Sequence, residues 1–173
     1  RKETVASGLA AALAGVFTGV CCMPNTDPVN DNGSVTRYLL ERAKAVSPVR
    51  LYPVGAVTKE SKGEELAPFA ELLEAGVVAL SDDGQPVGRS PVMRRALEYA
   101  GSLGLVVIDH CEDKDLAGEG SMHEGAVSLR LGLQGIPAEA EAIPARRDIY
   151  LARLTGQRLH LVHLSTKLAV DAV

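Results

Sequence analysis

Short apolar runs alternate with longer amphipathic segments along most of the chain. The apolar runs, which we predict to be β-strands, are residues 16–23, 49–57, 76–81, 104–109 and 158–164. The amphipathic segments, which we predict to be α-helices, are residues 3–14, 33–46, 64–75, 91–102 and 138–154. Because the strands are almost continuously apolar, both of their faces should be covered, as in a parallel sheet. The pattern therefore predicts an α/β fold with about five β/α units.

Two α/β architectures fit this alternation, a doubly wound open sheet and part of a (β/α)8 barrel. A dinucleotide-binding sheet would carry a glycine-rich turn after its first strand, and none is present. Polar residues instead lie at or just past the carboxyl ends of several strands, namely Asn25, Asp82, Asp83, His110 and His163. In a barrel those ends meet at one mouth, so this distribution favours an incomplete (β/α)8 barrel of the TIM type. Residues 118–137 are rich in glycine, and we expect them to form an ordered excursion over that mouth.

Composition narrows the classes of function. The chain has 173 residues, of which 46% are hydrophobic and 23% charged, as in an ordinary globular domain. Its net charge of -4 argues against a nucleic-acid surface, which needs clustered basic residues. No segment has the length of a membrane span or the pattern of a signal peptide. Cys21, Cys22 and Cys111 lack metal-binding spacing, so we expect reduced thiols in the interior of a cytoplasmic protein.

The residues that carry candidate chemistry are His110, His163 and the pair Asp82–Asp83. A single histidine is more often a packing or surface residue than a ligand, and Asp-Gly is a common turn. Two imidazoles and a carboxylate arriving from three strand ends nevertheless match the ligands that zinc prefers. A metal there would generate a hydroxide nucleophile at neutral pH. We expect Asp82, beside the ligand, either to cap the turn or to accept hydrogen bonds from nearby backbone, and His160 to serve in packing.

Several motifs carry a more specific signal. The stretches MPNTDPVND, SDDGQPV, HCEDKDL, GSMHEGAVSLRLGLQGIPAEAEA and HLVHLST occur in this order across nearly the whole chain. Together they closely resemble the type I bacterial dihydroorotases of the amidohydrolase superfamily. The resemblance implies a TIM-type barrel with one or two zinc ions. It also implies reversible hydrolysis of L-dihydroorotate to N-carbamoyl-L-aspartate, a step of pyrimidine biosynthesis.

The resemblance assigns roles to four residues. Asp83 resembles the metal ligand that replaces a carboxylated lysine of related enzymes, and His110 and His163 resemble ligands of the second metal. Asn25 of MPNT resembles a residue that binds the carboxylate of the substrate. Two neighbours of His110, Cys111 and Glu112, are candidates to orient its imidazole.

Some parts of the family pattern are not found in residues 1–173. The HxHxR motif is missing, and Arg1 does not occupy the position of its arginine. The aspartate expected to act as ligand and general base would lie beyond Val173, so we expect no catalytic residue within this chain. We therefore expect residues 1–173 to be the central part of a metal-dependent amidohydrolase barrel domain, truncated at both ends and inactive alone.

Two other functions remain open at this point. One is a different cyclic amidohydrolase, such as a hydantoinase or an allantoinase, although those enzymes bridge their metals with a carboxylated lysine. The other is a non-catalytic, dihydroorotase-like partner of aspartate transcarbamoylase. The expected partners are a small-molecule substrate, further copies of the chain in a homo-oligomer and aspartate transcarbamoylase, with neither nucleic acid nor membrane among them.

Overall fold

The computed structural model describes residues 3–173, so Arg1 lies outside the described residues. The strands are β1 (Gly19–Cys22), β2 (Arg50–Gly55), β3 (Ala79–Ser81), β4 (Val107–His110), β5 (Met122–His123), β6 (Gly135–Ile136) and β7 (Leu159–Val162). The helices are α1 (Val5–Ala14), α2 (Gly33–Val46), the 3-10 turn η1 (Lys59–Ser61), α3 (Phe69–Ala75), α4 (Ser90–Ser102), α5 (Lys114–Ala117), α6 (Ala126–Leu131), α7 (Glu139–Thr155) and α8 (Lys167–Val170). All ten elements predicted from the sequence are present.

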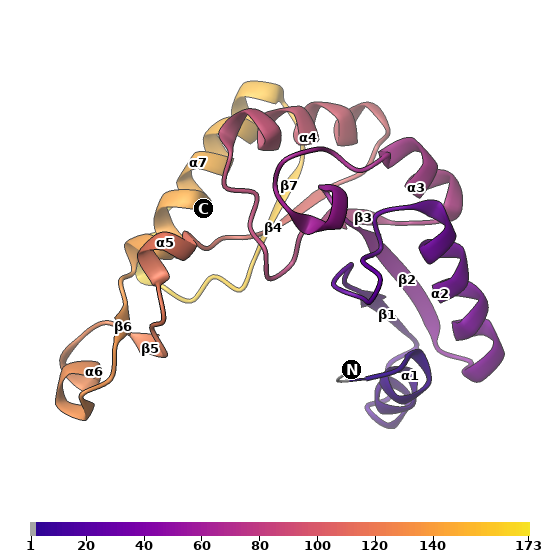
Figure 1. Cartoon of the computed structure of the whole chain (residues 1–173), viewed down its shortest axis with the longest axis horizontal. Coiled ribbons are helices and arrows are strands. Elements are labelled where there is room, and N and C mark those ends of the chain that lie inside the picture. Colours follow the sequence, from indigo (N-terminus) through magenta and orange to yellow (C-terminus); the bar gives the residue numbers. More distant parts are fainter. Residues whose placement is uncertain (1–2) are drawn as a thin grey trace.

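Five of the strands form one curled parallel sheet. Its order is β1-β2-β3-β4-β7, and every neighbouring pair is parallel. The helices α2, α3, α4 and α7 follow the outer side of the resulting arch, and the concave side faces away from them (Figure 1). A doubly wound sheet would reverse its strand order and carry helices on both faces. The sequential order and one-sided helices confirm the prediction of an incomplete (β/α)8 barrel.

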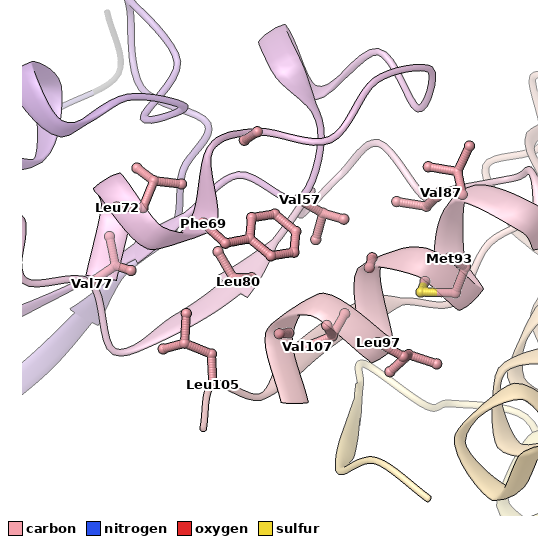
Figure 2. Close-up of a cluster of buried hydrophobic side chains, with 14 residues drawn as sticks. Val57, Phe69, Leu72, Val77, Leu80, Val87, Met93, Leu97, Leu105 and Val107 are labelled. Atoms are coloured by element: carbon pink, nitrogen blue, oxygen red, sulfur yellow. The ribbon is translucent and has the colours of Figure 1, made fainter. Parts of the chain in front are cut away.

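The main hydrophobic core lies between the sheet and the helices α3 and α4 (Figure 2). Phe69 and Leu72 of α3 meet Met93 and Leu97 of α4 above Leu80 of β3, and all five side chains are fully buried. The apolar residues of α4 recur at helical spacing, so they share the face that packs on the sheet. This packing fixes β3 and β4, whose carboxyl ends carry Asp83 and His110.

Element boundaries differ from the predicted ones for local reasons. Helix α3 begins at Phe69 rather than at residue 64, because Pro68 occupies the position that precedes the first helical residue. Strand β1 begins at Gly19 rather than at residue 16. Val16 adopts a φ of 63°, which belongs to the turn after α1 rather than to an extended strand.

The predicted excursion at residues 118–137 is an ordered lobe. It contains the two-stranded sheet β5-β6 and helix α6, and it extends away from the curled sheet (Figure 1). The expectation that it covers the mouth is therefore only partly met. Met122, His123 and Ile136 turn back towards the strand ends, where they line a cavity shared with His110.

The faces of the sheet explain two wrong expectations. Val20 and Leu161 pack on the helix side of β1 and β7. Side chains alternate along a strand, so Cys21 and His160 point to the concave side, where both are exposed. Within residues 3–173, Cys21 is therefore not an interior thiol and His160 does not serve in packing. The expected burial holds for Cys111, and Cys22 is half-buried.

Candidate metal centre

The turn after β3 separates the two adjacent aspartates. The Gln85 amide donates to the carbonyl of Asp82 at 2.7 Å, and Gly84 has a φ of 78°, where residues with side chains are disfavoured. Lys114 of α5 fixes the same turn, because its Nζ donates to the Gly84 carbonyl at 2.7 Å. The turn places Asp82 in the interior and Asp83 at the rim of the sheet.

Asp82 is a structural residue. Its carboxylate accepts a hydrogen bond from the Val57 amide at 2.8 Å, and further ones from the amide and the hydroxyl of Thr58. These donors lie just past the end of β2, so the carboxylate joins β2 to β3 at the rim. Burial raises the pKa of Asp82, although the hydrogen bonds from Thr58 and Val57 oppose that effect. We expected Asp82 either to cap the turn or to accept hydrogen bonds from nearby backbone, and the second alternative is observed.

Asp83 faces two imidazoles from other strands. Its Oδ1 lies 3.3 Å from Nε2 of His163 and 3.7 Å from Nδ1 of His110. The two imidazole rings stand edge to face with centroids 5.3 Å apart. All three residues offer one ligand atom within 4.8 Å of the other two. The structure thus brings together the three residues that the sequence predicts to be metal ligands.

The donor set suits a divalent cation of the zinc type. Among residues 3–173, the buried Nδ1 of His110 has no hydrogen-bond partner. An unpaired buried polar atom is costly, and this one lies 3.7 Å from the carboxylate oxygen Oδ1 of Asp83. Nitrogen and carboxylate oxygen are the ligands expected for zinc in a hydrolytic site. The three residues therefore fit such a metal.

Asn25 lies at the same rim, just past β1. Its Nδ2 donates to Oδ2 of Asp83 at 3.1 Å, so it orients the carboxylate whose other oxygen faces the imidazoles. Asn25 is an exposed residue. The role in substrate binding stays a prediction, and the contact with Asp83 is one that the sequence did not indicate.

The neighbours of His110 point in opposite directions. Oε2 of Glu112 lies 3.7 Å from Nε2 of His110, which is longer than a hydrogen bond, so its role in orienting the imidazole stays a prediction. Cys111 instead turns into the interior, and its Sγ donates to Oδ2 of Asp109 at 3.4 Å. Burial, followed by the charge of Asp109, raises the pKa of this thiol, which keeps it protonated.

Behind His110 lies a buried charged cluster that sequence reasoning missed. Asp109 and Asp148 of α7 lie together with Cys111, and Arg147 binds Asp148 through Nε at 2.7 Å. Burial and the charge of Asp148 raise the pKa of Asp109 to about 8. Arg147 also donates to the Gly88 carbonyl at 2.7 Å, which ties α7 to the loop after β3. Helical spacing puts Asp148 on the same face of α7 as the buried residues Ala140 and Pro144. This spacing is the sequence signal from which the burial of Asp148 could have been predicted.

Solved structures of known proteins resemble this fold. The structure resembles L-hydantoinase from Arthrobacter aurescens with a TM-score of 0.70 at 17% identity, covering 96% of this chain and 38% of that one. D-hydantoinase from Bacillus sp. AR9 gives a TM-score of 0.71 at 21% identity, over 98% and 39% of the two chains. These likenesses, together with the rim of imidazoles and carboxylates, define the class as a β/α barrel with a candidate metal centre.

Relatives found by sequence identify the family, which the solved structures do not. Residues 1–169 match the family described as Dihydro-orotase-like, and the chain belongs to that family. It is 58% identical over 172 residues to the dihydroorotase of Anaeromyxobacter dehalogenans strain 2CP-C, covering 99% of this chain and 40% of the relative. The dihydroorotase of Solibacter usitatus is 54% identical over 171 residues, with the same coverage. The chain spans about 40% of the length of the curated relatives it matches.

Proposed function

We propose that the protein carrying this chain is a dihydroorotase. It reversibly hydrolyses L-dihydroorotate to N-carbamoyl-L-aspartate with the help of zinc, as a step of pyrimidine biosynthesis. The observation that supports this best is the convergence of Asp83, His110 and His163 at one rim, in a chain that matches dihydroorotases along almost its whole length.

The residues of the rim have distinct proposed roles. Asp83, His110 and His163 hold a zinc ion, and Asn25 binds the carboxylate of the substrate while it orients Asp83. Zinc supplies Lewis acidity, which makes water nucleophilic at neutral pH and polarises a carbonyl group. Glu112 keeps the imidazole of His110 in place.

The remaining groups of the reaction are proposed to come from outside residues 1–173. Since the chain spans about 40% of its relatives, we place it as the central part of a longer barrel domain. The further metal ligands and the general base that removes and returns the proton would then lie on other strands of the same barrel. The chain by itself should be inactive.

The partners follow from this assignment. We propose a small-molecule substrate, a homo-oligomer, association with aspartate transcarbamoylase and a location in the cytoplasm. No helix among residues 3–173 is both long and apolar enough to cross a membrane.

A substrate panel tests the proposal on the full-length, zinc-loaded protein. Dihydroorotate should be turned over, and hydantoin and allantoin should not. Preferred hydrolysis of hydantoin or allantoin would overturn the assignment, and so would a complete lack of zinc binding and activity, which would indicate a structural partner.

A matched pair of variants tests the site. Asp83→Ala should lose bound zinc and lower turnover by about 100-fold or more, since even outer partners of a metal ligand contribute about 10–100-fold. Asp115→Ala, which removes an exposed carboxylate on α5, should leave both unchanged. Equal zinc content in the two variants would refute the role of Asp83.

A further inference from the structure

Glu141 on the first turn of α7 reaches across to the loop that follows β7. Its Oε1 accepts hydrogen bonds from the Ser165 amide at 2.9 Å, the Thr166 amide at 2.9 Å and the Thr166 hydroxyl at 3.0 Å. Its Oε2 accepts from the Ser165 amide at 3.1 Å and from the Ser165 hydroxyl at 2.7 Å. Both carboxylate oxygens are therefore used to hold two consecutive residues of one loop.

The ionised form of Glu141 is the one that these contacts require. Burial opposes ionisation, but the hydrogen bonds from Ser165 and Thr166 outweigh it and lower the pKa of Glu141. Every partner is a donor, and hydrogen bonds to a charged acceptor are stronger than neutral ones. Thr166 is itself buried and accepts from the Ala169 amide at 3.2 Å, so the loop is connected firmly to α8.

This loop carries His163. Its backbone has a φ of 60°, which is sparsely populated for residues other than glycine and persists only where the surroundings impose it. On one side β7 is fixed by its pairing with β4, where Val162 lies opposite His110. On the other side, Ser165 and Thr166 are fixed by Glu141. The imidazole is 60% exposed, so its direction is determined by the backbone rather than by packing.

We propose that Glu141 is a positioning residue for the metal centre: by holding Ser165 and Thr166, it keeps His163 turned towards Asp83 and His110. The proposal rests on the metal site proposed above. Among residues 3–173, Glu141 forms no hydrogen bond or ion pair with the three proposed ligands, so it acts through the backbone of the loop.

The test is zinc affinity, measured by competition with a chelating dye on the full-length protein. Glu141→Gln keeps the shape of the side chain but turns an amide N–H2 group towards donors, which removes at least the bonds to one oxygen. We expect the zinc dissociation constant to rise on the order of 10-fold, as for other partners that orient a ligand. The visible spectrum of the cobalt-substituted protein should change as well, because the position of one ligand changes.

The matched control is Glu139→Gln, the same change of charge two residues earlier at an exposed position of α7. It should bind zinc as the wild type does. Thermal unfolding and circular dichroism of the metal-free proteins identify a temperature at which all variants are folded. Should Glu141→Gln not fold, Ser165→Ala removes one hydroxyl donor only, and a several-fold weaker zinc affinity is expected.

The outcomes separate the two proposals. Zinc binding that depends on Asp83, together with weakened binding in Glu141→Gln, supports the positioning role. Zinc binding that depends on Asp83 but is unchanged in Glu141→Gln, or in Ser165→Ala if the former does not fold, overturns that role and leaves the proposed function intact. A wild type that binds no zinc, or binds it regardless of Asp83, overturns the metal site and the positioning role with it.

Discussion

Substitution by alanine should affect a different property at each of the two adjacent aspartates, Asp82 and Asp83. Asp82 is buried and accepts hydrogen bonds from the Val57 amide and from the amide and hydroxyl of Thr58. Asp83 is half-buried and faces the imidazoles of the candidate metal centre. We therefore predict that Asp82→Ala lowers stability, whereas Asp83→Ala mainly lowers zinc affinity.

The loss of stability in Asp82→Ala can be calculated from the hydrogen-bond donors that lose their acceptor. Alanine cannot accept from either amide, and an unsatisfied buried donor costs about 1–3 kcal/mol. Two such donors would lower the free energy of unfolding by about 2–6 kcal/mol. Removing a carboxyl that burial already disfavours in its ionised form offsets part of this loss. We expect a net decrease of about 2–4 kcal/mol, a large fraction of a typical domain stability of about 5–15 kcal/mol.

Equilibrium unfolding in urea, on metal-free full-length protein, measures this difference. Asp82→Asn keeps one acceptor oxygen and should recover part of the lost stability. Asp83→Ala, the neighbouring control, should shift the free energy of unfolding by less than about 1 kcal/mol, because removing its carboxylate leaves no buried backbone amide without an acceptor. If Asp82→Ala stays within about 0.5 kcal/mol of the wild type, or if the two alanine variants are equally destabilised, the structural role of Asp82 is wrong.

Two further predictions concern the buried carboxyl cluster and the core. Between pH 3.8, the ordinary pKa of an aspartate, and about pH 8, the raised pKa of Asp109, the folded protein holds a proton on Asp109 that the unfolded chain has lost. The contribution of Asp109 to the free energy of unfolding is therefore greatest below this pH range and is lost as the pH rises through it. Urea unfolding between about pH 5 and pH 8 should show a flatter pH dependence for Asp109→Asn than for the wild type, and parallel profiles would contradict this. Leu97→Ala, at a fully buried position of α4, should lower the free energy of unfolding by about 2–5 kcal/mol in the same assay. Leu154→Ala, at a leucine of α7 that is 64% exposed, should change it by no more than about 0.5 kcal/mol, and similar losses for both would be inconsistent with the core described.

Most of the fold and the three proposed ligands could be predicted because both depend on local periodicity. Apolar runs identify strands whatever they pair with, and parallel strands bring their carboxyl ends to the same edge. Asp83, His110 and His163 each lie at or just past the carboxyl end of such a run, so their convergence required only the barrel arrangement.

The features that escaped prediction depend on contacts between distant segments. The sequence does not reveal that Glu141 meets Ser165, or that Arg147 reaches the Gly88 carbonyl, because nothing local specifies how α7 sits against its neighbours. Arg147 follows another arginine on α7, and nothing in the sequence indicates that it binds the fully buried Asp148. The strands β5 and β6 have two residues each, which is too short for any alternation to be seen.

The pairing of β4 with β7 bears on the order in which the molecule folds. Within the sheet, Leu80 pairs with Val107, 27 residues later, whereas Val107 pairs with Leu159, 52 residues later. Closing a loop of twice the length costs about 0.6 kcal/mol more in chain entropy, and the lobe between these strands must first be accommodated. Among the five strands of the described sheet, we therefore expect β7 to join last, which pulse-labelled hydrogen exchange would detect as late protection of its amides. Since His163 follows β7 directly, the imidazole would reach Asp83 only after the other four strands have paired, and a cation bound there would then hold β7 in place against strands that are already assembled.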